Sequence, residues 1–128
     1  MAAYGNAALR AVELLKRRTC ESPKDAWRLA ASEVFAHSPS AQAKVCPRGT
    51  FLGLCSSGVV EGVPAGNYTR SEKNKLYGLR ALEILRRSPA LANDENTLWA
   101  KVIDGETKVP NYQMEVVTSL WKNGFLSK

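Results

Sequence analysis

The sequence predicts an all-α protein, a compact six-helix domain built from two similar three-helix halves. Two observations support this fold class. Apolar residues recur at helical spacing in six stretches, several of which open on a residue that caps helices. The second half of the chain also repeats the first, almost residue for residue over one helix. With 128 residues, of which 45% are hydrophobic, the chain can bury one core without disulfides or a structural metal.

The first half is expected to hold three main helices. An amphipathic helix covers 4–18, and Ser22, followed by proline, caps the second helix. Ser38, also followed by proline, repeats this signal before a short, single-turn segment. Pro47 then opens the third main helix, which Gly58 ends as a left-handed cap residue.

Two glycines, Gly49 and Gly53, stand on one side of the third predicted helix. Glycine inside a helix costs about 1 kcal/mol relative to alanine, so a pair of them needs a reason. The spacing indicates that another backbone approaches closely along that side. We expect the neighbour to be a helix rather than a ligand.

The second half shows the same order of helices. Its start signals are Thr69 with Glu72, which form a capping-box pattern, then Asn93 or Asp94, and a residue near Asn111. Residues 79–87 repeat 9–17, and both stretches carry an Arg-Glu-Arg polar stripe beside the apolar one. The two halves are therefore expected to fold alike.

The repeat divides a single domain, 1–128, into halves of about 4–66 and 67–128. Neither half can bury much of its surface alone, so the two should share one core about a pseudo-twofold axis. The apolar tails after Gly58 and Gly124 are equivalent in the repeat. They could pair as two very short antiparallel strands, although so short a ladder is marginal without support.

The composition favours a cytoplasmic protein. Three cysteines are an odd set in a chain whose core needs no disulfides, which indicates a reducing compartment. Arg10 and Glu13 interrupt the apolar start of the chain, which argues against a secretory signal. No uncharged run is long enough to cross a membrane, so we expect no membrane partner.

The sequence contains no recognisable catalytic or cofactor motif. His37 is the only histidine, and a zinc site needs about four cysteine or histidine ligands in local clusters. Cys46, beside Pro47 at a helix start, is the one cysteine whose position favours a thiolate, and a structural thiol is the favoured interpretation. The sequence thus predicts no catalytic residue, no metal and no cofactor.

A basic and aromatic cluster marks the crossover between the halves. Its members are Lys44, Arg48, Tyr68, Arg70, Lys73 and Lys75, with Asn67 and Asn74 as neutral hydrogen-bonding groups. Because the whole chain also carries a net charge of +6, this cluster is a candidate surface for nucleic acid or another anionic partner. The alternative is that these groups only cap and solvate helix ends. The predicted helix connections are too long for a strict helix-turn-helix.

Three motifs carry a resemblance to a known family: CPRGTFLGLC, GVPAGNYTRSEKNKLY and NYQMEVVTSLW with NGFL. In these motifs the chain resembles an uncharacterised family of small bacterial proteins of unknown function, over nearly its whole length. The resemblance implies a bacterial, cytoplasmic, mainly helical domain and assigns no activity. It adds Gln113 to the candidates, and the family pattern has a serine where this chain has Tyr112. The candidate ligand-binding residues are then Arg48, Asn67, Tyr68, Arg70, Lys73, Asn74 and Gln113.

Three classes of function remain open at this point. The first is a non-enzymatic binding module that uses the polar and basic crossover, with nucleic acid or another anion as its ligand. The second is a protein interaction or dimerisation module, which would make the protein a homodimer. The third is an enzyme with an unrecognised polar site. Whether the candidate side chains point into a cleft or inward to hold loops separates a binding role from an architectural one.

Overall fold

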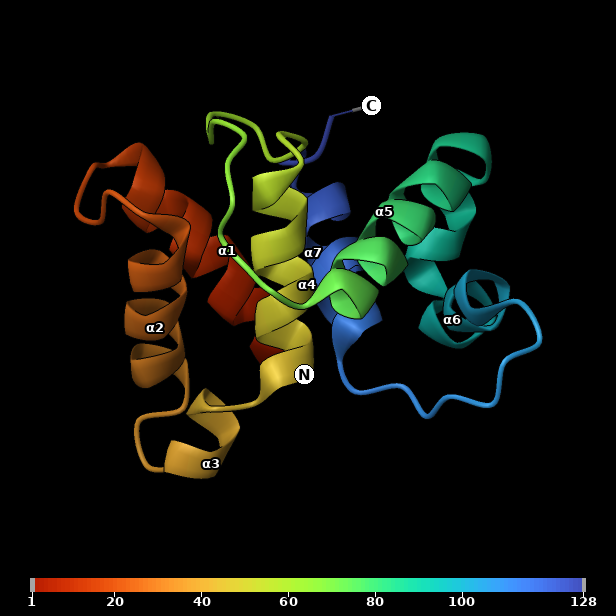
Figure 1. The fold of residues 1–128 in the computed structure, drawn as a ribbon, viewed down its shortest axis with the longest axis horizontal. Helices are drawn as coiled ribbons and strands as arrows, with labels where there is room; N and C mark the ends of the chain where they lie inside the picture. The colour runs from red at the N-terminus through yellow and green to blue at the C-terminus, as the bar shows by residue number, and fades with distance from the viewer. Residues whose placement is uncertain (1, 128) are drawn as a thin grey trace.

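Eight helical segments follow one another in residues 2–127, the part of the chain that the computed structural model describes (Figure 1). They are α1 (Ala3–Lys16), α2 (Pro23–Val34), α3 (Pro39–Gln42), α4 (Val45–Ser56), α5 (Glu72–Arg87), the 3₁₀-helix η1 (Pro89–Asn93), α6 (Glu95–Ile103) and α7 (Gln113–Lys122). Only α3 and η1 are shorter than nine residues. The predicted all-α class with six main helices is confirmed.

Three of the predicted start signals cap helices as expected. The side chains of Ser22, Ser38 and Asp94 accept hydrogen bonds from backbone N–H groups three residues further on, at 3.1, 3.2 and 3.2 Å respectively. The hydroxyl of Thr97 also donates to Asp94, at 2.7 Å. These bonds favour the ionised carboxylate and hold the pKa of Asp94 below its usual value.

Three predicted boundaries are wrong. The first helix was expected to reach residue 18, but α1 ends at Lys16 and Arg18 has a left-handed φ of 58°. α5 begins at Glu72, and Thr69 does not cap it. The Thr69 Oγ1 atom instead accepts a hydrogen bond from the backbone N–H of Ser71 at 3.1 Å, which closes a turn ahead of the helix. α4 begins at Val45, so Pro47 lies inside its first turn, where a missing N–H leaves no helical bond unmade.

The helices pack in pairs around α4 and α7, which cross near the centre (Figure 1). α1 packs against α2 and α7, while α5 packs against α4 and α6. This leaves α2 and α6 on opposite sides of the molecule (Figure 1). Between α4 and α5, the crossover segment runs along the gap between α2 and α4 before it reaches α5 (Figure 1).

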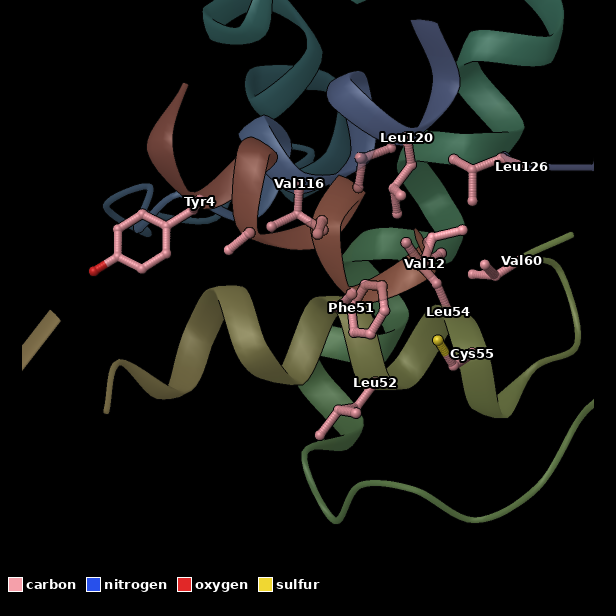
Figure 2. Close-up of a cluster of buried hydrophobic side chains, with 14 of the residues drawn as sticks. Tyr4, Val12, Phe51, Leu52, Leu54, Cys55, Val60, Val116, Leu120 and Leu126 are labelled. Atoms are coloured by element: carbon pink, nitrogen blue, oxygen red, sulfur yellow. The ribbon is translucent and has the colours of Figure 1, made fainter. Parts of the chain in front are cut away.

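The core lies where α1, α4 and α7 meet. Phe51 projects from α4 toward Val12 of α1 and Val116 of α7, and all three side chains are fully buried (Figure 2). Leu52 points away from this cluster, from the opposite side of α4, toward the crossover segment (Figure 2). One face of α4 therefore builds the core, and the other supports the crossover.

The glycine pair of α4 lies against α5, as predicted. A Cβ atom on Gly53 would stand 2.6 Å from the Cα atom of Lys75, and one on Gly49 would stand 3.0 Å from the Cβ atom of Ser71. Real Cβ atoms do not approach a backbone carbon at 2.6 Å, so Gly53 sets the distance between the two helices. A comparable glycine, Gly5 of α1, lies against α7.

The tails after α4 and α7 pair as the repeat predicts. Gly58 and Gly124 both take left-handed φ angles, 74° and 76°, at the two helix ends. Beyond them, Val60 and Leu126 form a single antiparallel β-bridge. Two backbone hydrogen bonds flank this bridge, from Glu61 to Phe125 at 2.8 Å and from Ser127 to Val59 at 2.9 Å.

These contacts agree with a pseudo-twofold relation between the halves. The repeat makes Val60 the counterpart of Leu126, so the β-bridge joins two equivalent positions. It also makes α1 the counterpart of α5 and α4 that of α7, and α1 packs on α7 as α5 packs on α4. The half-turn itself stays a prediction, which superposition of 4–66 on 67–128 would test.

Candidate functional site

A hollow of about 580 Å³ opens between α2, the start of α4 and the crossover segment. We call it the basic pocket. Its lining residues are Lys24, Asp25, Trp27, Arg28, Gln42, Arg48, Leu52, Tyr68, Thr69 and Arg70. Its volume lies within the range of about 300–1,000 Å³ that is typical of small-molecule sites.

Positive charge dominates this pocket. Lys24 and Arg28 come from α2, Arg48 comes from α4, and Arg70 comes from the crossover. Asp25 is the one carboxylate of the lining, and it accepts a hydrogen bond from Arg28 at 2.9 Å. Within residues 2–127, the other three cations form no ion pair. All three are exposed, so their charges can interact with solvent or with a bound anion.

Trp27 contributes a buried donor without an acceptor. Its side chain is 2% exposed and packs on Phe51, with 5.4 Å between the ring centroids. In the part of the chain that the structure describes, its Nε1–H group has no hydrogen-bond partner. An unpaired buried donor of this kind costs about 1–3 kcal/mol. Trp99 provides the contrast, because its Nε1–H donates to the carbonyl of Lys108 at 2.9 Å.

This contrast makes a testable prediction. Trp27→Phe and Trp99→Phe remove the same volume from two buried sites, but only the second removes a hydrogen bond. We expect Trp27→Phe to lower the free energy of unfolding by about 1 kcal/mol less than Trp99→Phe. Urea denaturation of the two variants and the parent measures this difference. A larger loss for Trp27→Phe would mean that its N–H group is paired in solution.

Tyr68 is held rigidly at one side of the basic pocket. Its hydroxyl donates to the carbonyl of Pro64 at 2.8 Å, and its backbone N–H donates to Ser56 Oγ at 2.9 Å. Gly66 lies against the ring, because a Cβ atom there would stand 2.7 Å from the Tyr68 Cζ atom. The loop therefore fixes this ring before any ligand arrives.

Three of the seven candidate residues line the basic pocket: Arg48, Tyr68 and Arg70. Asn67 and Lys73 are exposed but lie outside its lining. The structure therefore brings together residues from two of the sequence motifs, CPRGTFLGLC and GVPAGNYTRSEKNKLY, although about 20 positions of chain separate them.

The remaining two candidates, Asn74 and Gln113, are buried and bonded to each other. Gln113 Nε2 donates to Asn74 Oδ1 at 3.4 Å, and Asn74 Nδ2 donates to Ser71 Oγ at 2.8 Å. Gln113 Oε1 accepts a hydrogen bond from the backbone N–H of Asn111 at 2.6 Å. These amides join the start of α5 to the start of α7, which is the inward orientation expected of residues that hold loops.

The cationic side chains of α2 were not among the residues predicted from the sequence. Lys24, Trp27 and Arg28 lie three or four positions apart, so they share one side of a helix. That spacing was visible in the sequence. The sequence did not show which segment faces this side of α2, because the crossover lies against it only as a result of tertiary packing.

Tyr112 lies at a different hollow, lined also by Tyr4, Phe35 and Glu115. It precedes α7 with a left-handed φ of 67°, and its ring packs at 4.7 Å between centroids on that of Tyr4. Burial, with smaller effects of Tyr112 and Glu115, raises the pKa of Tyr4 above its ordinary value. The Glu115 carboxylate caps the start of helix α1, since it accepts hydrogen bonds from the backbone N–H groups of Tyr4 and Gly5.

Across residues 2–127 no group of three or more His, Cys, Asp or Glu is placed to hold a metal ion. Cys55 is fully buried, and burial raises the pKa of its thiol far above the ordinary value, which suppresses the thiolate. None of the helices described is both long and apolar enough to cross a bilayer.

Comparison with known proteins gives a family but no characterised relative. No curated protein and no solved structure matches the chain. Residues 1–127 match a family of unknown function, DUF6979. That match spans both halves, including the segments that form the basic pocket and the paired tails. The chain therefore belongs to the family of unknown function DUF6979.

Proposed function

We propose that this protein is a non-enzymatic binding module that holds an anionic ligand in the basic pocket. One observation carries the proposal: cations from three separate segments line a single hollow whose one carboxylate is already paired with Arg28. The segments are distant in the sequence, so the fold itself gathers the charge. Arginine in particular suits phosphate and carboxylate groups, because its planar fork can donate two parallel hydrogen bonds.

The placement of two of the four pocket cations argues against a role in helix capping. Lys24 is the second residue of α2 and Arg48 the fourth of α4, so both lie in the first turn. The positive end of the helix dipole lies there and disfavours a cation by about 0.3–1 kcal/mol at the surface. An anion in the pocket would interact favourably with both the side chains and the helix ends.

The same lining favours binding over catalysis. It supplies positive charges and hydrogen-bond donors, which hold and orient an anion. Of the lining groups that could act as a base or nucleophile, Asp25 is bonded to Arg28 and exposed to water, the Tyr68 hydroxyl donates to Pro64, and the Thr69 hydroxyl oxygen accepts from Ser71. A binding role therefore uses the groups that are present.

The test is binding of inorganic pyrophosphate, measured by isothermal titration calorimetry. The double variant Arg48→Gln, Arg70→Gln should weaken binding at least tenfold, since each bond to a charged group contributes about 1.5–3 kcal/mol. Lys73→Gln with Lys101→Gln is the matched control, because it removes the same charge from two exposed residues outside the pocket. Equal affinity of the pocket variant and the parent, or an equal loss in the control, would contradict the proposal.

A further inference from the structure

A second hollow adjoins the basic pocket, and Tyr68 lines both. This second hollow has a volume of about 530 Å³ and lies between the end of α1, the turn before α2 and the start of the crossover. Leu15, Lys16, Arg18 and Pro64 are among its lining residues. We call the two hollows together the groove.

The groove continues the positive charge of the basic pocket. Lys16 and Arg18 line the second hollow, with Glu21 as its one carboxylate. Lys16 Nζ lies 4.6 Å from the centroid of the Phe125 ring, an interaction that leaves its charge in place. Both hollows that Tyr68 lines thus contain cations, so a ligand with anionic groups at intervals matches the groove better than a single anion does.

The third element is the fixed ring of Tyr68. Its bonds to Pro64 and Ser56 and its contact with Gly66 hold it in the lining of both hollows without a ligand. An aromatic side chain fixed in a cationic groove is the arrangement by which proteins bind single-stranded nucleic acid, since every base has a face that can stack. In a duplex the bases are stacked on each other and their faces are not available to the ring.

We infer that the groove binds single-stranded nucleic acid, with one base on Tyr68 and phosphates of neighbouring nucleotides against the cations of both hollows. The inference rests on the proposed function, because one of its two ends is the basic pocket. It adds the class of ligand and the role of three residues beyond the pocket cations: Tyr68 as the stacking residue, and Lys16 and Arg18 as phosphate-binding residues.

The test uses thymidine monophosphate and single-stranded oligothymidylate of eight nucleotides, with oligouridylate of the same length as the RNA arm. We expect the oligomers to bind at least tenfold more tightly than the mononucleotide at low salt. Tyr68→Leu should weaken oligomer binding about tenfold, whereas Tyr68→Phe, which keeps the ring, should weaken it much less. Tyr112→Leu is the control, because Tyr112 is 48% exposed and lines a different hollow.

Arg18→Gln separates this inference from the proposed function. Arg18 is exposed and lies outside the basic pocket, so the variant should fold and should bind pyrophosphate like the parent. It should nevertheless bind the oligomers more weakly. Its log affinity should also depend less steeply on log salt, by about 0.7, because one phosphate fewer is neutralised. Thermal unfolding of each variant checks that the fold is intact.

The outcomes are distinguishable. If pyrophosphate binds in the basic pocket but the oligomers bind no better than the mononucleotide, or are indifferent to Arg18→Gln and Tyr68→Leu, the inference is overturned and the proposed function stands. Equal affinity for a duplex of the same length would also overturn it. If no anion binds at the pocket, both fail together.

Discussion

Replacing Phe51 with alanine should lower the free energy of unfolding by about 3–5 kcal/mol. Phe51 is fully buried, and its ring packs on that of Trp27 in α2 with 5.4 Å between the centroids. It projects toward the cluster that α1 and α7 form with α4 (Figure 2). The change removes transfer free energy and leaves a cavity that three helices would have to move to fill. Because the free energy of unfolding of a domain is only about 5–15 kcal/mol, this one change would remove much of the stability.

Urea denaturation followed by circular dichroism measures the Phe51 effect. Phe125→Ala is the matched control, because Phe125 is the same residue type but only partly buried, on the tail after α7. Its loss should be clearly smaller. A loss below about 1 kcal/mol for Phe51→Ala would mean that the ring does not fill the core as described.

Gly53→Ala is the second change with a large expected effect. The new Cβ atom would stand 2.6 Å from the Cα and Cβ atoms of Lys75, so α4 and α5 would have to separate. Overpacking of this kind costs about 1–3 kcal/mol and occasionally more, against about 1 kcal/mol gained from the helix propensity of alanine. Because the obstacle is backbone rather than a mobile side chain, we expect a net loss of about 2 kcal/mol.

Gly78→Ala is the matched control for Gly53→Ala. Gly78 is also a buried helical glycine where α4 and α5 pack, but its Cβ atom would meet Leu54 and Thr50 side chains at 3.2 Å, and these can give way. The two variants share the gain in propensity, so the difference in their denaturation midpoints reports the backbone approach. If Gly53→Ala were as stable as Gly78→Ala, α4 and α5 would not pack as closely as the structure shows.

Local signals predicted the helix starts well where one side chain bonds an unpaired backbone N–H group of the first turn. The Ser22, Ser38 and Asp94 side chains each bond a backbone N–H three positions away, so neighbours in sequence suffice. The Thr69 signal failed because its hydroxyl oxygen accepts from a second local donor, the N–H of Ser71, and α5 begins only at Glu72. A cap pattern thus predicts that a helix starts nearby, but it does not predict which residue is the first of the helix.

The structure brings together only some of the candidate residues, for a related reason. Residue type identified Arg48, Tyr68 and Arg70, which line the basic pocket, but it grouped them with Asn74 and Gln113. Those two amides look like ligand-binding groups in the sequence, yet each is buried, and a buried amide must find hydrogen-bond partners within the protein. Burial, which the sequence did not specify, separates these two amides from the residues that line the basic pocket.

The sequence by itself determined the helical class, the order of the helices and the equivalence of the two tails, because periodicity, caps and the repeat are properties of neighbouring residues. Only the tertiary structure decided that Lys24 and Arg28 of α2 line one hollow together with Arg48 and Arg70. Only it placed Tyr68 in the lining of two cationic hollows. The physical reason is that convergence of distant segments depends on how whole helices pack, and in this chain the packing of α4 against α5 depends on the backbone approach at Gly53.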